Sequence, residues 1–181
     1  VYTTSLDKTS WTFADGQRYV SYYPYNSNSI TSSADISFSL EGQTQEGNNS
    51  TAHLGEYDLM YAEAIFNVGE QIVFSFSHKC AVVNFRLQVP AGKEFTHFSI
   101  SADACIPNTV TMNMSDGSVI LNEGAEQFQV SLKNVKSDSD GILSIWAMIP
   151  SCDMTSSTMV VTAQTKDGTV YSSDVIPMKK Y

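Results

Sequence analysis

The residues that have the chemistry for a reactive site are few and far apart. His78 occupies an apolar position of an alternating segment, between Ser77 and Lys79. Successive side chains of a strand point to opposite faces, so Ser77 cannot serve as a nucleophile paired with this imidazole. His53 and His97 stand at no spacing typical of metal ligands. We predict a protein that is not an enzyme, with no catalytic residue, metal or cofactor, in which His78 is hydrogen-bonded to backbone or to a carboxylate.

The acidic residues and the cysteines indicate no further site. Residues 138–141, Asp-Ser-Asp-Gly, resemble the start of a calcium loop but lack its third acidic position and its later glutamate. An ordinary turn is the simpler interpretation. Three cysteines, Cys80, Cys105 and Cys152, are too few and too dispersed for a disulfide scaffold or a zinc site. We expect buried thiols, with one structural disulfide as the alternative.

Aromatic side chains are concentrated between Trp11 and Tyr25, and they have two interpretations. Aromatic faces stack on sugars, which makes Trp11, Tyr22, Tyr23 and Trp146 the candidate glycan contacts. The other interpretation is a sandwich core with a tyrosine-lined edge. Because neighbouring positions of a strand alternate between faces, these residues cannot all share one exposed surface, and this favours the second interpretation.

The composition excludes several classes of partner. The chain has 181 residues, a formal net charge of -9 and 42% hydrophobic residues. A chain of this length and composition folds around one substantial core. Its negative charge repels nucleic acid and anionic lipid surfaces. No apolar run reaches the roughly 18–20 residues that a membrane-spanning helix needs.

The elements that must position these residues are strands, and residues 74–89 form the longest strand-like run. Its first half places Phe74 and Phe76 on one face, and its second half places Phe85 and Leu87 at the opposite parity. A change of phase by one residue requires a β-bulge or a crossing between sheets near residues 82–83. Because such a run is not stable alone, we predict that it lies in the centre of a sheet.

Other alternating runs complete an all-β chain of about ten strands without a long helix. Residues 36–40 form a one-faced strand, and Asp-Gly pairs at residues 116–117 and 167–168 predict two hairpins. Residues 142–149 are almost entirely apolar and predict a second central strand. The polar residues 41–56 predict a loop that is either mobile or functional. The architecture that fits is a two-sheet antiparallel β-sandwich.

Four short motifs, taken in order, resemble the fimbrillin family of Bacteroidetes, the subunits and accessory proteins of surface fimbriae. They are Tyr-Tyr-Pro-Tyr at residues 22–25, Asp-Leu-Met-Tyr-Ala at 58–62, Phe-Ser-Phe-Ser-His-Lys-Cys-Ala at 74–81 leading into Val-Asn-Phe-Arg-Leu at 83–87, and Ala-Met-Ile-Pro at 147–150. Their order and spacing across residues 19–150 are similar to those of the N-terminal domain of that family.

The resemblance implies a transthyretin-like Greek-key sandwich formed by residues 1–181 as a single domain, with the family's second domain absent or outside this chain. It implies export as a lipoprotein, with an anchor upstream of residue 1 as the only link to the outer membrane, and display on the cell surface. The expected partners are other fimbrial subunits, in a homo- or hetero-polymer, and a host glycan or protein receptor.

The resemblance also implies assembly by insertion of a strand of one subunit into a groove of the next. An added strand satisfies an open sheet edge with backbone hydrogen bonds. The candidates for the inserted strand are the terminal segments with strand character, namely Val1 and Leu6 at one end and Thr169, Val170, Tyr171, Val175 and Ile176 at the other. Our leading hypothesis is a fimbrial subunit that assembles in this way and contributes to adhesion. The alternative is a carbohydrate-binding module of a surface glycan-uptake system.

Overall fold

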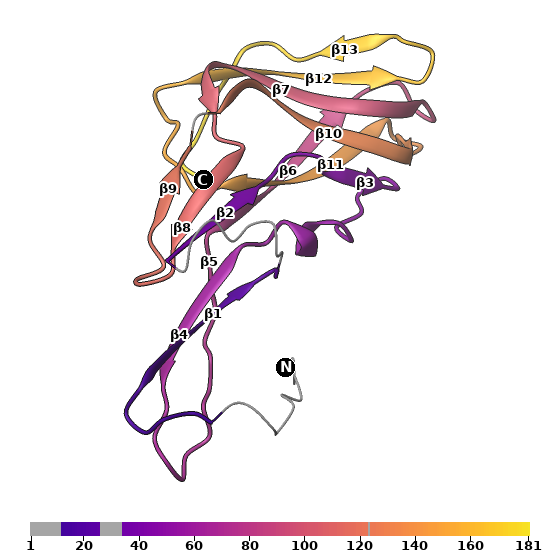
Figure 1. The fold of residues 1–181 in the computed structure, drawn as a ribbon. Helices are drawn as coiled ribbons and strands as arrows, with labels where there is room; N and C mark the ends of the chain where they lie inside the picture. The colour runs from indigo at the N-terminus through magenta and orange to yellow at the C-terminus, as the bar shows by residue number, and fades with distance from the viewer. Residues whose placement is uncertain (1–11, 26–33, 123) are drawn as a thin grey trace.

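The computed structural model describes residues 12–25, 34–122 and 124–181, and this part of the chain is built from strands (Figure 1). Its strands are β1 (Arg18–Tyr23), β2 (Asp35–Ser39), β3 (Thr44–Glu46), β4 (Met60–Ile65), β5 (Ser77–His78), β6 (Cys80–Gln88), β7 (Glu94–Ile106), β8 (Thr109–Asn113), β9 (Val119–Leu121), β10 (Ala125–Lys136), β11 (Ile142–Pro150), β12 (Thr158–Thr165), β13 (Val170–Ser172) and β14 (Ile176–Pro177). One turn of 3-10 helix, η2 (Leu54–Glu56), is the only helical element of the described part. The predicted all-β fold is confirmed, with more strands than the ten expected because several have only two or three residues.

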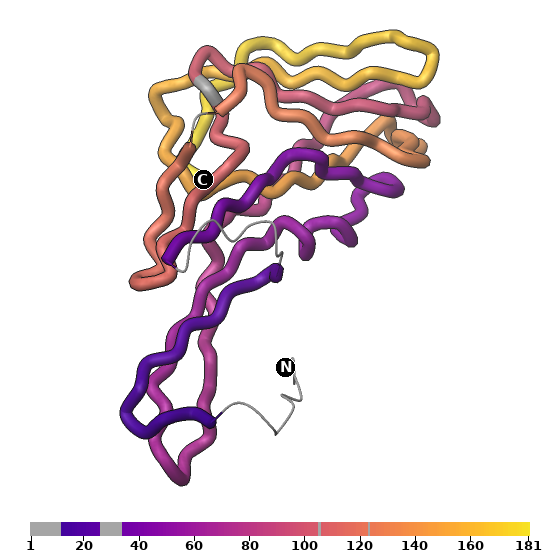
Figure 2. The backbone as a smooth tube through the Cα atoms, in the orientation of Figure 1, coloured from indigo at the N-terminus to yellow at the C-terminus, as the bar shows by residue number. Residues whose placement is uncertain are grey.

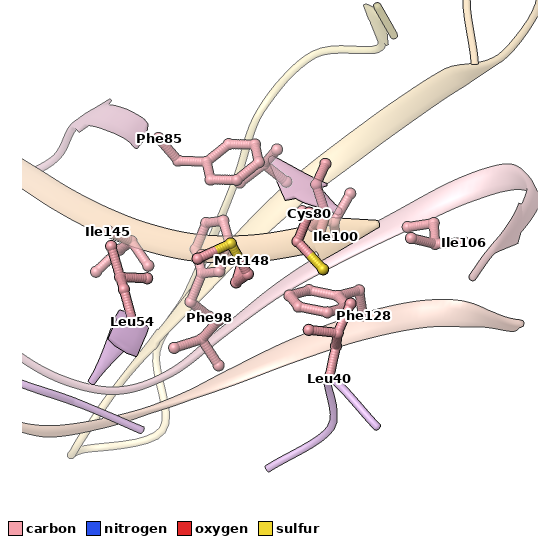
Figure 3. Packing of buried hydrophobic residues seen from close by; sticks show 14 of the residues in the cluster. Leu40, Leu54, Cys80, Phe85, Phe98, Ile100, Ile106, Phe128, Ile145 and Met148 are labelled. Atoms are coloured by element: carbon pink, nitrogen blue, oxygen red, sulfur yellow. The ribbon is translucent and has the colours of Figure 1, made fainter. Parts of the chain in front are cut away.

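Two layers of sheet enclose the core. The larger sheet has the strand order β13-β12-β7-β10-β3, and β14 also pairs with β12. The facing sheet is the antiparallel pair β11-β6, which keeps one register along its whole length. Phe85 of β6 and Phe98 of β7 meet between the layers, with ring centroids 5.0 Å apart (Figure 3). The predicted two-layer β-sandwich is therefore present.

Alternating apolar residues account for most of this core. In β12 every second side chain from Met159 to Thr165 is buried. In β10, Phe128 and Leu132 are buried in the same way, and an irregularity at Asn134, where φ is 54°, shifts the next inward side chain by one position. Period two in the sequence therefore predicts which residues of these strands face inward, but it does not predict this bulge.

A ribbon formed by β1, β4 and β5 projects from one end of the sandwich, and we call it the arm (Figures 1 and 2). β1 and β4 pair along their full lengths. A further sheet, β2-β8-β9, contains the hairpin predicted around residues 116–117. The turn of this hairpin holds the arm, because the ring of Tyr61 packs on Gly117 and the guanidinium of Arg18 donates to the carbonyl of Ser115.

The segment predicted as one central strand is divided between two sheets. β5 belongs to the arm and β6 belongs to the sandwich. The expected crossing between sheets is present, but it falls at Lys79, whose N–H donates to the carbonyl of Leu59, and not near residues 82–83. Residues 71–76 are not a strand, and β11 is the only described strand that pairs with β6. The predicted central position was wrong, because alternation identifies an inward face but not the number of neighbouring strands.

The polar residues 41–56 form two short elements instead of an irregular loop. β3 pairs with β10 in parallel, at one edge of the larger sheet, so the sandwich is not purely antiparallel. η2 lies against β11. The segment therefore closes one side of the sandwich. The transthyretin-like Greek-key order of strands stays a prediction.

Replacing Gly117 with alanine should loosen the arm. Gly117 has a φ of 68°, which is unfavourable for any residue with a Cβ, and an added Cβ would overlap the ring of Tyr61. We expect Gly117→Ala to lower the free energy of unfolding by about 1–3 kcal/mol in chemical denaturation. The control is Gly168→Ala, where φ is 88° and nothing lies within 4 Å of the added atom. Equal losses in the two variants would contradict a role for the Tyr61 contact.

Candidate functional site: the two edges of the β11-β6 sheet

The outer edge of β11 has no described strand beside it, yet its backbone groups are bonded. The N–H and C=O groups that point away from β6, which we call outward, belong to Ile142, Ser144, Trp146 and Met148. Side chains from residues 43–53 occupy the position where a neighbouring strand would lie. Unpaired peptide groups in a sheet are costly when they are removed from water, so these side chains are essential to the sheet.

Gln43 and Gln45 each use both ends of the carboxamide. Gln43 accepts from the N–H of Met148 at 2.8 Å and donates to the C=O of the same residue at 2.7 Å. Gln45 accepts from the N–H of Trp146 at 2.8 Å and donates to the C=O of Ser144 at 2.9 Å. Both glutamines are 0% exposed. A carboxamide offers a donor and an acceptor, as a peptide group does, and it can therefore replace the missing strand.

Asn48 and His53 extend this set of bonds. Asn48 accepts from the N–H of Ser144 at 2.8 Å and donates to the C=O of Ile142 at 3.0 Å. Nε2 of His53 lies 3.1 Å from the C=O of Trp146, so this nitrogen carries the proton. Burial lowers the pKa of His53, and its Nδ1 is buried without a partner among the described residues. We call these four side chains the polar seam: Gln43, Gln45, Asn48 and His53.

The opposite edge of this sheet, along β6, has no neighbouring strand in the part of the chain that the structure describes. In an antiparallel pair, the backbone N–H and C=O groups of two opposite residues either bond to each other or all point away from the partner strand. The outward residues of β11 therefore identify those of β6, which are Val82, Asn84, Arg86 and Gln88. Within the described ranges, the backbone N–H and C=O groups of these four residues have no strand partner.

The inward side chains of β6 are incompletely covered. Phe85 is 8% exposed, but Val83 and Leu87 on either side of it are only half-buried. The residues opposite them in β11, Ala147 and Leu143, are 0% exposed. A strand added beside β6 would cover these side chains and bond the free peptide groups. The geometry is that of an acceptor edge for an extended segment.

The titratable residues singled out in the sequence bind their neighbours. Nδ1 of His78 lies 2.7 Å from a carboxylate oxygen of Asp58, whereas the hydroxyl of Ser77 donates to the carbonyl of Tyr61. The structure does not bring His78 and Ser77 together as a catalytic pair. The carboxylate of Asp138 accepts from two backbone N–H groups of its own turn.

The described part of the chain contains no cluster of three or more His, Cys, Asp or Glu side chains that could bind a metal ion. Among the described residues there is also no helix that is long and apolar enough to cross a membrane.

Two of the cysteines have free thiols. Cys80 is buried, and burial raises its pKa to about 11. Cys152 is half-buried, and burial raises its pKa as well. These two residues form no disulfide, in agreement with the expectation of thiols. The side chain of Cys105 lies outside the described part.

The aromatic residues named as glycan contacts come from two elements. Tyr22 and Tyr23 lie on β1 of the arm. Trp146 lies on β11, where its Nε1 donates to the side chain of Asn49 at 2.9 Å. All three are half-buried, and Trp11 lies outside the described residues. Glycan binding by these residues stays a prediction.

Comparison with known proteins agrees with this architecture. The family model described as fimbrillin-like matches residues 2–179. The chain belongs to the fimbrillin-like family. A search of curated protein sequences gives no match. A crystal structure from Bacteroides ovatus, of a protein provisionally described as a cell adhesion protein, has a similar fold with a TM-score of 0.61 and 17% identity. The alignment covers 99% of this chain and 65% of that one, so the chain spans less than two-thirds of that protein.

The fimbrillin-like chain holds its C-terminal candidate strand in its own sheet. β13 pairs with β12, and Tyr171 packs on Phe95 with ring centroids 6.0 Å apart. β14 pairs farther along β12, and Met178 beyond it is 5% exposed. Thr169 closes the preceding turn by accepting from Thr165. The exposed candidates of this segment are Thr169, Val170, Val175 and Ile176, while Val1 and Leu6 lie outside the described residues.

Sequence reasoning missed the polar seam of this fimbrillin-like protein. Gln43 and Gln45 stand two positions apart between Gly42 and Gly47, which is the spacing of one face of a short strand. Glutamine is mostly exposed in proteins, so a loop is the default interpretation of such a segment. The spacing was the only available signal, because a sequence does not reveal which distant backbone groups need a partner.

Replacing Gln45 with alanine should destabilise the fimbrillin-like sandwich strongly. The N–H of Trp146 would lose its partner, at a cost of about 1–3 kcal/mol, whereas the C=O of Ser144 would keep the N–H of Asn49. We expect the free energy of unfolding in urea to fall by about 1–3 kcal/mol. Gln129→Ala, an exposed position of β10, is the control and should change it by less than about 0.5 kcal/mol. A loss no larger than that of the control would contradict the proposed bonds.

The fimbrillin-like fold should lose stability in mild acid through His53. Its folded pKa is lowered from the ordinary value of 6.5, so the unfolded chain takes up the proton first and the free energy of unfolding falls as the pH drops below that value. His53→Gln keeps a donor but does not titrate. We expect its free energy of unfolding to fall less than that of the wild type between about pH 7.5 and pH 5. His97→Gln, at an exposed site, should follow the wild type; parallel curves for wild type and His53→Gln would exclude this role.

Proposed function

We propose that this protein is a structural or accessory subunit of a cell-surface fimbria, and that subunits join by strand addition at the β6 edge. The observation that carries the proposal is a strand edge that no described residue covers, with half-covered apolar side chains, in a sandwich whose opposite edge is closed. Membership of the fimbrillin-like family supports the fimbrial role. The description of the similar B. ovatus protein supports a contribution to adhesion. A lipid anchor and a host receptor stay predictions.

The chemistry of the β6 edge defines what it accepts. An incoming strand bonds to the outward peptide groups from Val82 to Gln88, and its alternate side chains pack beside Val83 and Leu87. Arg86 is exposed and has no ion pair among the described residues. The edge therefore favours an extended apolar segment that carries a carboxylate. The C-terminal candidate contains a carboxylate, Asp174, and the N-terminal candidate, residues 1–6, is followed directly by Asp7.

Within this proposal the inserted strand is the N-terminal segment of a neighbouring subunit, residues 1–6. The C-terminal segment is the weaker candidate, because its release would remove the partners of β12 and expose Met178. Release would also separate Tyr171 from Phe95. Exposure of the buried side chain of Met178 alone costs about 1.5–3 kcal/mol before any new contact forms.

A proline at Asn84 should block assembly without disturbing the fold. The N–H of Asn84 faces away from β11, so proline removes a donor that only an incoming strand would use. We expect Asn84→Pro to stay monomeric in light scattering and electron microscopy under conditions in which the wild type forms polymers. Asn84→Val keeps the N–H and should polymerise as the wild type does.

Deletion of residues 1–6 tests the donor in the same assay and should also abolish polymers. Polymerisation of Asn84→Pro at the wild-type rate would refute the β6 edge as the acceptor. Polymerisation of the deletion variant alone would refute only the choice of donor.

A further inference from the structure

Residues 43–47 cover one edge of the larger sheet and one edge of the β11-β6 sheet. Their backbone faces β10, where the C=O of Gln43 accepts from the N–H of Ser131 at 2.9 Å and the N–H of Gly47 donates to Lys133 at 3.0 Å. Their inward side chains cross to the other layer and bond β11. The same residues thus close the larger sheet and the β11-β6 sheet on one side.

Without this segment, β11 would be an adhesive edge. Residues 142–149 read Ile-Leu-Ser-Ile-Trp-Ala-Met-Ile and contain no charged residue and no proline. Exposed edges are normally protected by lysine, proline, a bulge or a covering element, and unprotected apolar edges pair with other chains. β11 keeps a regular register with β6, so it has no bulge either. From Ser144 to Met148, residues 43–53 are its only cover in the described part of the chain, while Asp138 bonds Ile142 at the start of the strand.

We infer that the polar seam is an edge guard, which prevents β11 from pairing with β11 of a second copy and so confines joining to β6. Two identical edges pair antiparallel about a two-fold axis and give a closed dimer. Joining of β6 to a different segment is head-to-tail and gives a filament. Subunits with both edges open would form a mixture of closed dimers and filaments. The inference rests on the proposed function only in naming β6 as the productive edge.

The test removes the two glutamines of the seam in a chain whose β6 edge is already blocked. Gln43→Met and Gln45→Met together keep side-chain length but remove every bond that the glutamines make to β11. In the Asn84→Pro background, we expect this variant to show twice the monomer mass in light scattering as concentration rises. Asn84→Pro alone should stay monomeric.

Two further variants identify the surface that pairs. Adding Trp146→Lys places a charge on the outward face of β11 and should restore the monomer. The matched control is Gln127→Met with Gln129→Met in the same background, two exposed glutamines of β10, which should stay monomeric. A folded, monomeric seam variant at every concentration would overturn the inference, as would a dimer that Trp146→Lys does not reverse.

If the seam variant does not fold, hydrogen exchange on the wild type tests whether the seam covers the edge of β11. The N–H groups of Ser144, Trp146 and Met148 should exchange as slowly as those of Leu143 and Ile145, which bond to β6. Fast exchange at the first three positions would show that the edge is not covered and would overturn the inference. Polymerisation of Asn84→Pro alone would instead count against the proposed function. In that case, loss of dimerisation on adding Trp146→Lys would still show whether β11 is the surface that pairs.

Discussion

A strand that is covered on both faces must still find partners for the peptide groups along both its edges, and this requirement governs the structure. β11 meets it with a strand on one side and the polar seam on the other. Because the seam supplies the missing bonds, Leu143 and Met148 can both be buried although they point to opposite faces. The nearly continuous apolar run of β11 depends on four polar side chains that lie about a hundred residues earlier in the sequence.

The seam also makes the two sides of the sandwich unequal. On one side, β3 and the glutamines connect the layers, so the core residues of β11 are sealed. On the other side, β6 ends the described sheet, with half-covered apolar side chains and with outward peptide groups that have no strand partner among the described residues. A body with one closed and one open side has a defined direction of joining. This asymmetry suits the filament subunit that we propose.

The sequence predicted the parts of the fold that follow from local periodicity. Alternation located the inward faces of β2, β10 and β12, and Asp116-Gly117 located the β8–β9 hairpin. It did not predict that residues 74–89 divide between the arm and the sandwich, because alternation is the same for an edge strand and a central one. The seam was also not predictable. Its bonds join residues about a hundred positions apart, and a glutamine that faces a strand edge has no local signature.

A junction built from carboxamides has a chemical lifetime as well as a thermodynamic stability. Hydrolysis of an asparagine or glutamine amide to an acid removes the donor, and asparagine is the more labile of the two. Gln43 and Gln45 are shielded from water, whereas Asn48 is half-exposed at the rim. Deamidation of Asn48 would set a carboxylate against the carbonyl of Ile142, two acceptors with no proton between them. Within the polar seam, chemical ageing would therefore begin at this one side chain.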